Sequence, residues 1–132
     1  MTAVDGEDGR SRKSVLLVED DDDIRECLSE LLADAGYGVV TAPNGAVALA
    51  YLQKCEHPCL ILLDLIMPVM NGSELLSALR SDDVLAPLPV VVVSATPEEA
   101  LNVRPLTQGF VKKPVDFELL LELVGRYCGA HA

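Results

Sequence analysis

The sequence has little positive charge and no long apolar run. Ten lysines and arginines stand against 21 aspartates and glutamates, which gives a formal net charge of −11. Proteins that bind nucleic acid need clustered Lys and Arg for the phosphates, so DNA and RNA are excluded as partners. No stretch has the apolar length of a signal peptide or a membrane span. We therefore expect a cytoplasmic protein whose partners include neither nucleic acid nor a membrane.

Cysteine and histidine are also scarce. The segment "CEHPC" at residues 55–59 places two thiols around His57, and no second cluster of such residues exists. A structural zinc site needs about four ligands, so this segment is not expected to hold zinc. All four cysteines are interpreted as reduced thiols, which suits a cytoplasmic protein. They are Cys27, Cys55, Cys59 and Cys128.

The length of 132 residues allows one domain with a single core. In residues 1–13 the acidic and basic side chains cancel and apolar side chains are almost absent, which predicts a disordered N-terminal leader. The domain is expected over residues 14–128, followed by a short tail at 129–132. This leaves no room for an output domain, so we expect a single-domain protein.

Three apolar runs do not alternate with polar residues, and each is expected to be a strand covered on both faces, as in a parallel sheet. They are 15–18, 59–65 and 88–95, and weaker runs at 37–42 and 109–113 bring the expected strands to five. Helical spacing predicts helices at 24–35, 46–53, 73–80 and 117–127. Gly36 is expected to end the first helix, and Asp116 to cap the last. This alternation predicts an α/β three-layer sandwich.

Five carboxylates at residues 19–23 directly follow the first apolar run. Like charges crowded at the end of a buried strand raise each other's pKa and resist being desolvated together. In an open parallel sheet, ligands bind beyond the carboxyl ends of the strands, so Glu19 and Asp20 are expected at that functional edge. Residues 21–23 are instead expected to open the next helix, where the helix dipole favours negative charge.

The other strand ends also supply polar groups. Asp64 lies within "LILLDLIMP", Ser94 ends "VVVVS", and Lys112 and Lys113 end the fifth run. A buried aspartate without a partner is costly, so Asp64 calls for a cation. With the acidic pair that follows the first strand it forms an oxygen-rich site suited to Mg²⁺. A lysine and a hydroxyl beside such a site complete the requirements for phosphoryl transfer, with Asp64 as the nucleophile.

The ordered set "VEDDDDIR", "LLDLIMPVMNG", "VVVSA" and "KKP" resembles the receiver domain of two-component response regulators. The likeness extends over about residues 14–128. It implies a flavodoxin-like fold with a five-stranded parallel sheet in the order 2-1-3-4-5. It also implies Mg²⁺ as cofactor, and a switch that phosphorylates and dephosphorylates itself rather than an enzyme with turnover.

The resemblance assigns the phosphoacceptor and the metal ligands. Asp64 matches the aspartate that becomes phosphorylated. Glu19 and Asp20 match the acidic pair that holds Mg²⁺ together with Asp64. The backbone carbonyl of Ile66 is implied as a further ligand.

The same resemblance assigns three residues that respond to the phosphoryl group. Lys113 matches the lysine that pairs with it, and Ser94 matches the hydroxyl residue that swings toward it. Phe110, three residues before Lys113, matches the switch aromatic, whose rotamer reports phosphorylation to the outer face.

The segment between Ser94 and Lys113 departs from the family pattern. It has 18 residues, roughly one helical turn fewer than expected. Pro97 and Pro105 bracket it, and Pro105 cannot lie inside a regular helix. The fourth helix is therefore expected to be short or irregular. In receivers this helix belongs to the output surface, so the usual partner and dimer contacts are in doubt.

Two side chains near the expected site bear on hydrolysis of the phosphoryl group. Ile66, close to Asp64, and Thr96, two residues after Ser94, are positioned to screen or guide the water that hydrolyses the acyl phosphate. Because Ile66 is apolar, it cannot orient that water. We therefore expect slow to moderate self-dephosphorylation.

The leading hypothesis is a stand-alone receiver that works as a switch or as a relay shuttle. His57 and His131 do not lie in sequences like a kinase phosphodonor site, so the phosphoryl group is expected from a histidine kinase, a histidine phosphotransfer protein or a small acyl phosphate. The output is expected to be contact with a downstream target protein. The alternative is a receiver that docks constitutively, with phosphorylation secondary. A small phosphohydrolase is disfavoured, because the sequence has no second carboxylate in the loop after Asp64 and no cap domain to enclose a substrate. A flavodoxin-like cofactor binder is disfavoured, because it needs a phosphate-cradling loop after the first strand, where this sequence has Glu and Asp.

Overall fold

The computed structural model describes residues 14–54 and 57–129. The strands are β2 (Ser14–Val18), β3 (Gly38–Ala42), β4 (Leu60–Leu63), β5 (Val90–Ser94) and β6 (Gly109–Lys112). The helices are α1 (Asp22–Asp34), α2 (Gly45–Lys54), α3 (Gly72–Arg80), α4 (Pro97–Val103), the 3-10 helix η2 (Arg104–Leu106) and α5 (Phe117–Cys128). Strand and helix alternate as predicted. The expected leader at 1–13 and residues 130–132 of the tail lie outside the described residues.

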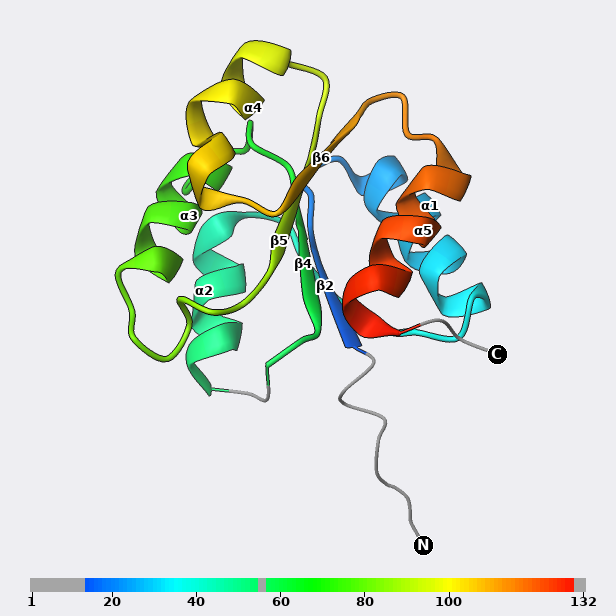
Figure 1. The fold of residues 1–132 in the computed structure, drawn as a ribbon, viewed down its shortest axis with the longest axis horizontal. Coiled ribbons are helices and arrows are strands. Elements are labelled where there is room, and N and C mark those ends of the chain that lie inside the picture. Colours follow the sequence, from blue (N-terminus) through cyan, green and yellow to red (C-terminus); the bar gives the residue numbers. More distant parts are fainter. Residues whose placement is uncertain (1–13, 55–56, 130–132) are drawn as a thin grey trace, which may run out of the picture.

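The five strands form one sheet in the order β3-β2-β4-β5-β6, and every neighbouring pair is parallel. The predicted order 2-1-3-4-5 and the flavodoxin-like class are therefore confirmed. Helices α1 and α5 cover one face of the sheet, and α2, α3 and α4 cover the other (Figure 1). Because all strands run the same way, their carboxyl ends share one edge.

Each face of the sheet has its own hydrophobic core, because neighbouring strand residues point to opposite faces. On β2, Leu16 and Val18 pack into the core under α2 and α3, whereas Val15 and Leu17 pack into the core under α1 and α5. All four residues of β4 are fully buried. Burial of each such side chain contributes about 1.5–3 kcal/mol, which explains why the central strands read as continuous apolar runs.

The ends of α1 follow the sequence prediction. Asp21 is the N-cap, and its carboxylate accepts a hydrogen bond from the Ile24 amide at 3.0 Å. Asp22 and Asp23 occupy the first turn, where the helix dipole stabilises negative charge. Gly36 follows the helix with a φ of 99°, a left-handed conformation that glycine adopts without steric cost. The acidic run therefore divides into a capping part and a part left at the sheet edge.

Helix α4 has seven residues, and the predicted shortening is confirmed. Pro105 lies in the 3-10 helix η2 that replaces the last turn. Val103 is the one residue of α4 that is buried. Helix α4 is therefore held to the sheet by a small apolar contact.

The interpretation of all cysteines as reduced thiols is wrong for two of them. Cys59 and Cys128 form a disulfide, with Cα atoms 5.2 Å apart. Cys59 lies just before β4 and Cys128 ends α5, which packs on the same face of the sheet. The two are 69 residues apart in sequence, so only the fold brings them together. Cys27 is free and exposed, and Cys55 lies outside the described residues.

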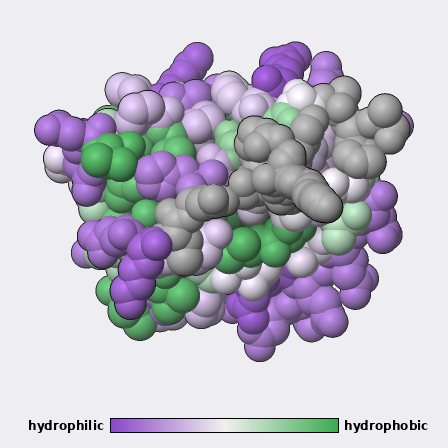
Figure 2. All heavy atoms as spheres, turned by 90° about the horizontal axis from the view of Figure 1, so that it is seen from below, coloured by the Kyte–Doolittle hydropathy of each residue, from purple (hydrophilic) through white to green (hydrophobic). Residues whose placement is uncertain are grey.

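The surface at the amino ends of the strands is shown in Figure 2. Hydrophilic residues dominate its rim, and hydrophobic areas lie between them in patches. Val84, in the turn after α3, is 67% exposed. No helix in the described part of the chain is long and apolar enough to cross a membrane.

We predict that reduction of the disulfide destabilises the fold. The bond closes a long loop between β4 and α5, and such a cross-link restricts the unfolded chain. The Cys59→Ser/Cys128→Ser variant should lose about 2–4 kcal/mol of unfolding free energy in urea titrations followed by circular dichroism. The Cys27→Ser variant is the control. If peptide mapping without reductant finds Cys59 and Cys128 unlinked, the assignment fails.

Candidate functional site

Five of the predicted site residues stand at or just after strand ends along one edge of the sheet, among them Ser94, which ends β5. Glu19 and Asp20 follow β2, Asp64 follows β4 and Lys113 follows β6. Their backbones are tied to neighbouring strands: the Glu19 amide donates to the Ala42 carbonyl at 3.0 Å. The edge predicted from the sequence therefore exists.

Three carboxylates converge at this edge. Glu19, Asp20 and Asp64 each offer an oxygen, and these oxygens lie within 4.8 Å of one another. Glu19 is 2% exposed and Asp64 is 7% exposed, whereas Asp20 faces solvent. Hard oxygen ligands of this kind suit Mg²⁺, which also keeps several waters. The donor set therefore fits the predicted cofactor.

One ammonium group faces the two buried carboxylates. The Lys113 Nζ donates to Glu19 Oε1 at 2.8 Å and lies 3.6 Å from Asp64 Oδ2. Burial acts to lower the pKa of Lys113, but the hydrogen bond to Glu19 and the charge of Asp64 outweigh it and raise that pKa. Lys113 is therefore charged, and this one ammonium group is shared by two buried carboxyl groups.

The pKa of Asp64 is raised from 3.8 to about 7. Burial is the largest cause, and the negative charge of Glu19 is the next. Lys113 and a hydrogen bond from the Ile66 amide act in the opposite direction but are weaker. A cation near Asp64 would favour its ionised, nucleophilic form.

Ser94 is buried at the end of β5, and its hydroxyl is engaged locally. Its Oγ accepts a hydrogen bond from the Thr96 amide at 3.1 Å and lies 3.4 Å from Thr96 Oγ1. The Ser94 carbonyl accepts from the Lys113 amide at 3.0 Å, which joins the ends of β5 and β6. Phe110, on β6, is 39% exposed.

Residues 15–125 match the model of the response regulator receiver domain family. The chain belongs to this family. This match confirms the resemblance predicted from the sequence motifs. Receiver domains act in two-component signalling and are switches rather than enzymes with turnover.

Three similar proteins show the range of this likeness. DivK of Brucella anthropi, a polar-differentiation response regulator, is 31% identical over 89% of this chain and 97% of DivK. The sensor histidine kinase TmoS of Ectopseudomonas mendocina is 41% identical over 76% of this chain, but the match spans only 10% of TmoS. The response regulator TrrA of Thermotoga maritima, solved in complex with Mg²⁺ and BeF, superposes with a TM-score of 0.79. It is 28% identical and the match covers 87% of this chain and 98% of TrrA.

Arg25, to which no sequence motif assigns a role, supports the acidic pair of this receiver domain. Its Nη1 donates to the Glu19 carbonyl at 2.9 Å, from the second turn of α1. The Asp21 amide in turn donates to Glu19 Oε2 at 3.1 Å. These bonds hold the Glu19 backbone and side chain in place. In the sequence, this role is marked by no more than an arginine six residues after Glu19. The contact can be recognised once the start of α1 shows that Arg25 points back to the Glu19 carbonyl.

Gly72 allows the loop after Asp64 to fold back against the strand end. A Cβ on Gly72 would lie 2.6 Å from the Asp64 carbonyl oxygen and 2.7 Å from Leu65 Cα, which no side chain tolerates. Its amide donates to the Leu65 carbonyl at 2.9 Å. The exposed Ile66 and Val69 lie in this loop, and Val69 has a φ of 70°, which is strained for a β-branched residue.

We predict that neutralising Asp64 stabilises the metal-free protein at high pH. The folded pKa lies above the unfolded value, so stability present below pH 4 is lost as the pH rises toward 7. Asp64→Asn removes that loss. The unfolding free energy of the variant, relative to that of the wild type, should therefore grow by about 2 kcal/mol between pH 5 and pH 8. Urea titrations in EDTA, with the exposed Asp83→Asn as control, measure it. An advantage independent of pH would contradict this electrostatic account.

Proposed function

We propose that this protein is a stand-alone receiver that accepts a phosphoryl group on Asp64 from a histidine kinase or a histidine phosphotransfer protein. The reaction depends on Mg²⁺, and phosphorylation switches a surface that contacts a downstream target protein. The observation that carries the proposal is the burial of Asp64 beside Glu19 with Lys113 as their shared cation. A purely structural aspartate gains nothing from a second buried carboxylate.

In this proposal, different residues act as the nucleophile, as the cation that stabilises the phosphoryl oxygens and as the metal ligands. An Asp64 oxygen attacks the phosphorus of the donor, the bond from phosphorus to the donor nitrogen or oxygen breaks, and an aspartyl phosphate forms. Lys113, already 3.6 Å from Asp64 Oδ2, offers positive charge to the phosphoryl oxygens. Glu19, Asp20, Asp64 and the Ile66 carbonyl would hold Mg²⁺, which supplies further neutralisation of the transferred charge.

Two further residues report the reaction. To donate to the phosphoryl group, the Ser94 hydroxyl must give up its hydrogen bond to Thr96 Oγ1, which alters the contacts at the start of α4. Phe110, half-exposed on the neighbouring strand, responds by a change of rotamer. Both movements change the surface around α4 and β6, where a target protein contacts the domain.

The comparisons support individual parts of the proposal. The TrrA complex contains Mg²⁺ and BeF in a domain with the same fold, which supports the metal dependence. DivK is matched over nearly its whole length, which supports a stand-alone receiver. Cytoplasmic location is part of the proposal, although the Cys59–Cys128 bond is unusual in a reducing compartment.

A second candidate function is a constitutive docking adaptor, which the short α4 favours. Val103 is the one buried residue of α4, so this helix packs against the sheet over a small area. A phosphoryl group therefore has less control over the position of α4. The two functions differ in one measurable quantity, because only the switch predicts that beryllium fluoride with Mg²⁺ changes the affinity for a target protein.

We predict that acetyl phosphate with Mg²⁺ adds one phosphoryl group, about 80 Da by intact-protein mass spectrometry. Asp64→Ala and omission of Mg²⁺ should each abolish the gain. Lys113→Ala should slow it by about a hundredfold, because a charge that stabilises the transition state is lost. The neighbouring Lys112→Ala is the matched control, since Lys112 is exposed. No gain in a wild-type protein that binds Mg²⁺ would refute the phosphoacceptor role.

The phosphorylated protein should lose its phosphoryl group slowly. Ile66 is 59% exposed beside the site and has no polar group to orient a hydrolytic water. Replacement by a polar residue of similar size, Ile66→Asn, should shorten the half-life of the aspartyl phosphate, followed by loss of the added mass. A wild-type half-life of seconds would contradict this expectation.

A further inference from the structure

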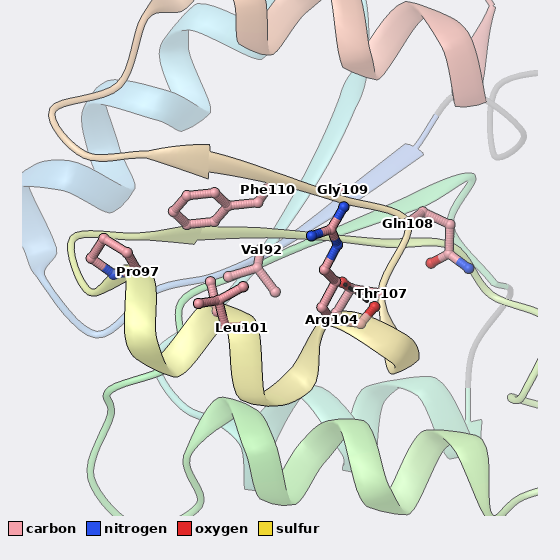
Figure 3. A pocket seen from close by; sticks show the side chains of 9 residues that line it. Val92, Pro97, Leu101, Arg104, Thr107, Gln108, Gly109 and Phe110 are labelled. Atoms are coloured by element: carbon pink, nitrogen blue, oxygen red, sulfur yellow. Dashed lines mark hydrogen bonds between the residues drawn. The ribbon is translucent and has the colours of Figure 1, made fainter.

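The short α4 leaves a cavity of about 550 Å³ between itself and the sheet (Figure 3). Val92 of β5 forms its floor, and Pro97 and Leu101 of α4 form one wall. Leu101 is 62% exposed. This volume lies within the usual range of small-molecule sites, roughly 300–1,000 Å³.

The two ends of this α4 cavity differ in chemistry. The Phe110 ring lies toward the Pro97 end, and the Arg104 guanidinium extends toward Gly109 at the other end (Figure 3). Within residues 14–54 and 57–129, the Arg104 side chain makes no hydrogen bond or ion pair, whereas Arg80 donates to the carbonyls of Leu106, Ala86 and Leu88. The cavity thus combines an apolar interior with an exposed guanidinium that bonds no side chain among the described residues.

We propose that the α4 cavity binds a small organic anion, with an aromatic or branched hydrocarbon body against Leu101 and Phe110 and a carboxylate or similar group on Arg104. Charge complementarity selects this occupant. The net charge of −11 repels anions from the protein as a whole, so an anion needs a local cation, and Arg104 is the one that lines this cavity. An apolar ligand without charge would gain no charge-assisted contact from this exposed guanidinium.

A second cavity of about 330 Å³, lined by Ile24, Cys27 and Phe117 of α1 and α5, does not offer the same chemistry. Its cation is Lys113, which is already bonded to Glu19. Its lining also includes the carboxylate residue Asp23, which repels an anion. The second cavity therefore provides a contrast for the test.

Occupancy of the α4 cavity is linked to the phosphorylation site, and this part of the inference rests on the proposed function. Pro97 directly follows Thr96, the hydrogen-bond partner of Ser94. Phe110 lies on the strand that leads to Lys113. A ligand touching both Pro97 and Phe110 biases the same two elements that the phosphoryl group moves, so each affects the other's equilibrium.

The binding test uses 8-anilinonaphthalene-1-sulfonate, an apolar anion whose fluorescence rises on burial, with the unphosphorylated full chain. We expect saturable binding of one molecule per chain, weakened about tenfold or more by Arg104→Gln, which removes a charge-assisted contact. Ala100→Phe, which fills the α4 cavity, should also abolish binding. Arg126→Gln, at an exposed arginine of α5, and Phe117→Ala, in the second cavity, should leave the affinity unchanged.

The neutral analogue N-phenyl-1-naphthylamine separates the apolar and ionic contributions. It should bind the wild type more weakly than the sulfonate does, and Arg104→Gln should not weaken it further. Absence of saturable binding, or binding of the sulfonate that responds to Phe117→Ala and not to Arg104→Gln, overturns the site. Because these measurements need no phosphoryl donor, their failure is distinct from failure of the proposed function.

The link to phosphorylation is tested separately, by the rate of mass gain from acetyl phosphate with and without saturating sulfonate. We expect a change in rate of about threefold or more in the wild type and a smaller change in Arg104→Gln at the same probe concentration, in line with typical coupling energies. An equal rate with and without the bound probe overturns the link and leaves the binding site standing.

Discussion

The receiver domain is organised around the burial of two carboxylates with one ammonium. Glu19 and Asp64 are almost inaccessible to water, and Lys113 is the cation between them. Desolvation of like charges costs free energy that one lysine offsets only in part, as the raised pKa of Asp64 shows. This repulsion between buried carboxylates is what a divalent cation at the site would relieve, and the donor set of Glu19, Asp20 and Asp64 fits such an ion.

The surrounding structure keeps these charges together. Complete burial of β4 fixes the strand that presents Asp64, and Arg25 fixes the backbone of Glu19. The bond from the Lys113 amide to the Ser94 carbonyl aligns the ends of β5 and β6. In the proposed function, a change at Asp64 acts first on Ser94 and then on the start of α4, a helix in which Val103 is the one buried residue. We propose that the end of the fully buried strand β4 carries the chemistry and that the sparsely buried α4 carries the response.

Most of this arrangement could be predicted from the sequence, because parallel strands have continuous apolar runs and their carboxyl ends must share an edge. Asp64 and Glu19 were placed by that argument, whereas the choice of Lys113 over Lys112 came from the resemblance to receiver domains. The bond between Cys59 and Cys128 escaped it, since pairing over 69 residues depends on how α5 packs. The role of Arg25 and the open space beneath α4 escaped it too, because both depend on side-chain directions that no sequence pattern encodes.

The most direct test of this account is calorimetric titration of the protein with Mg²⁺ at pH 7 and pH 8.5, in buffers of different ionisation enthalpy. If the cation relieves the repulsion at Asp64, Mg²⁺ should bind and should displace a fraction of a proton at pH 7, where Asp64 is partly protonated. Proton release should disappear at pH 8.5 and in Asp64→Asn. Absence of Mg²⁺ binding, or binding without proton release at pH 7, would contradict the claim that a divalent cation neutralises the buried carboxylates.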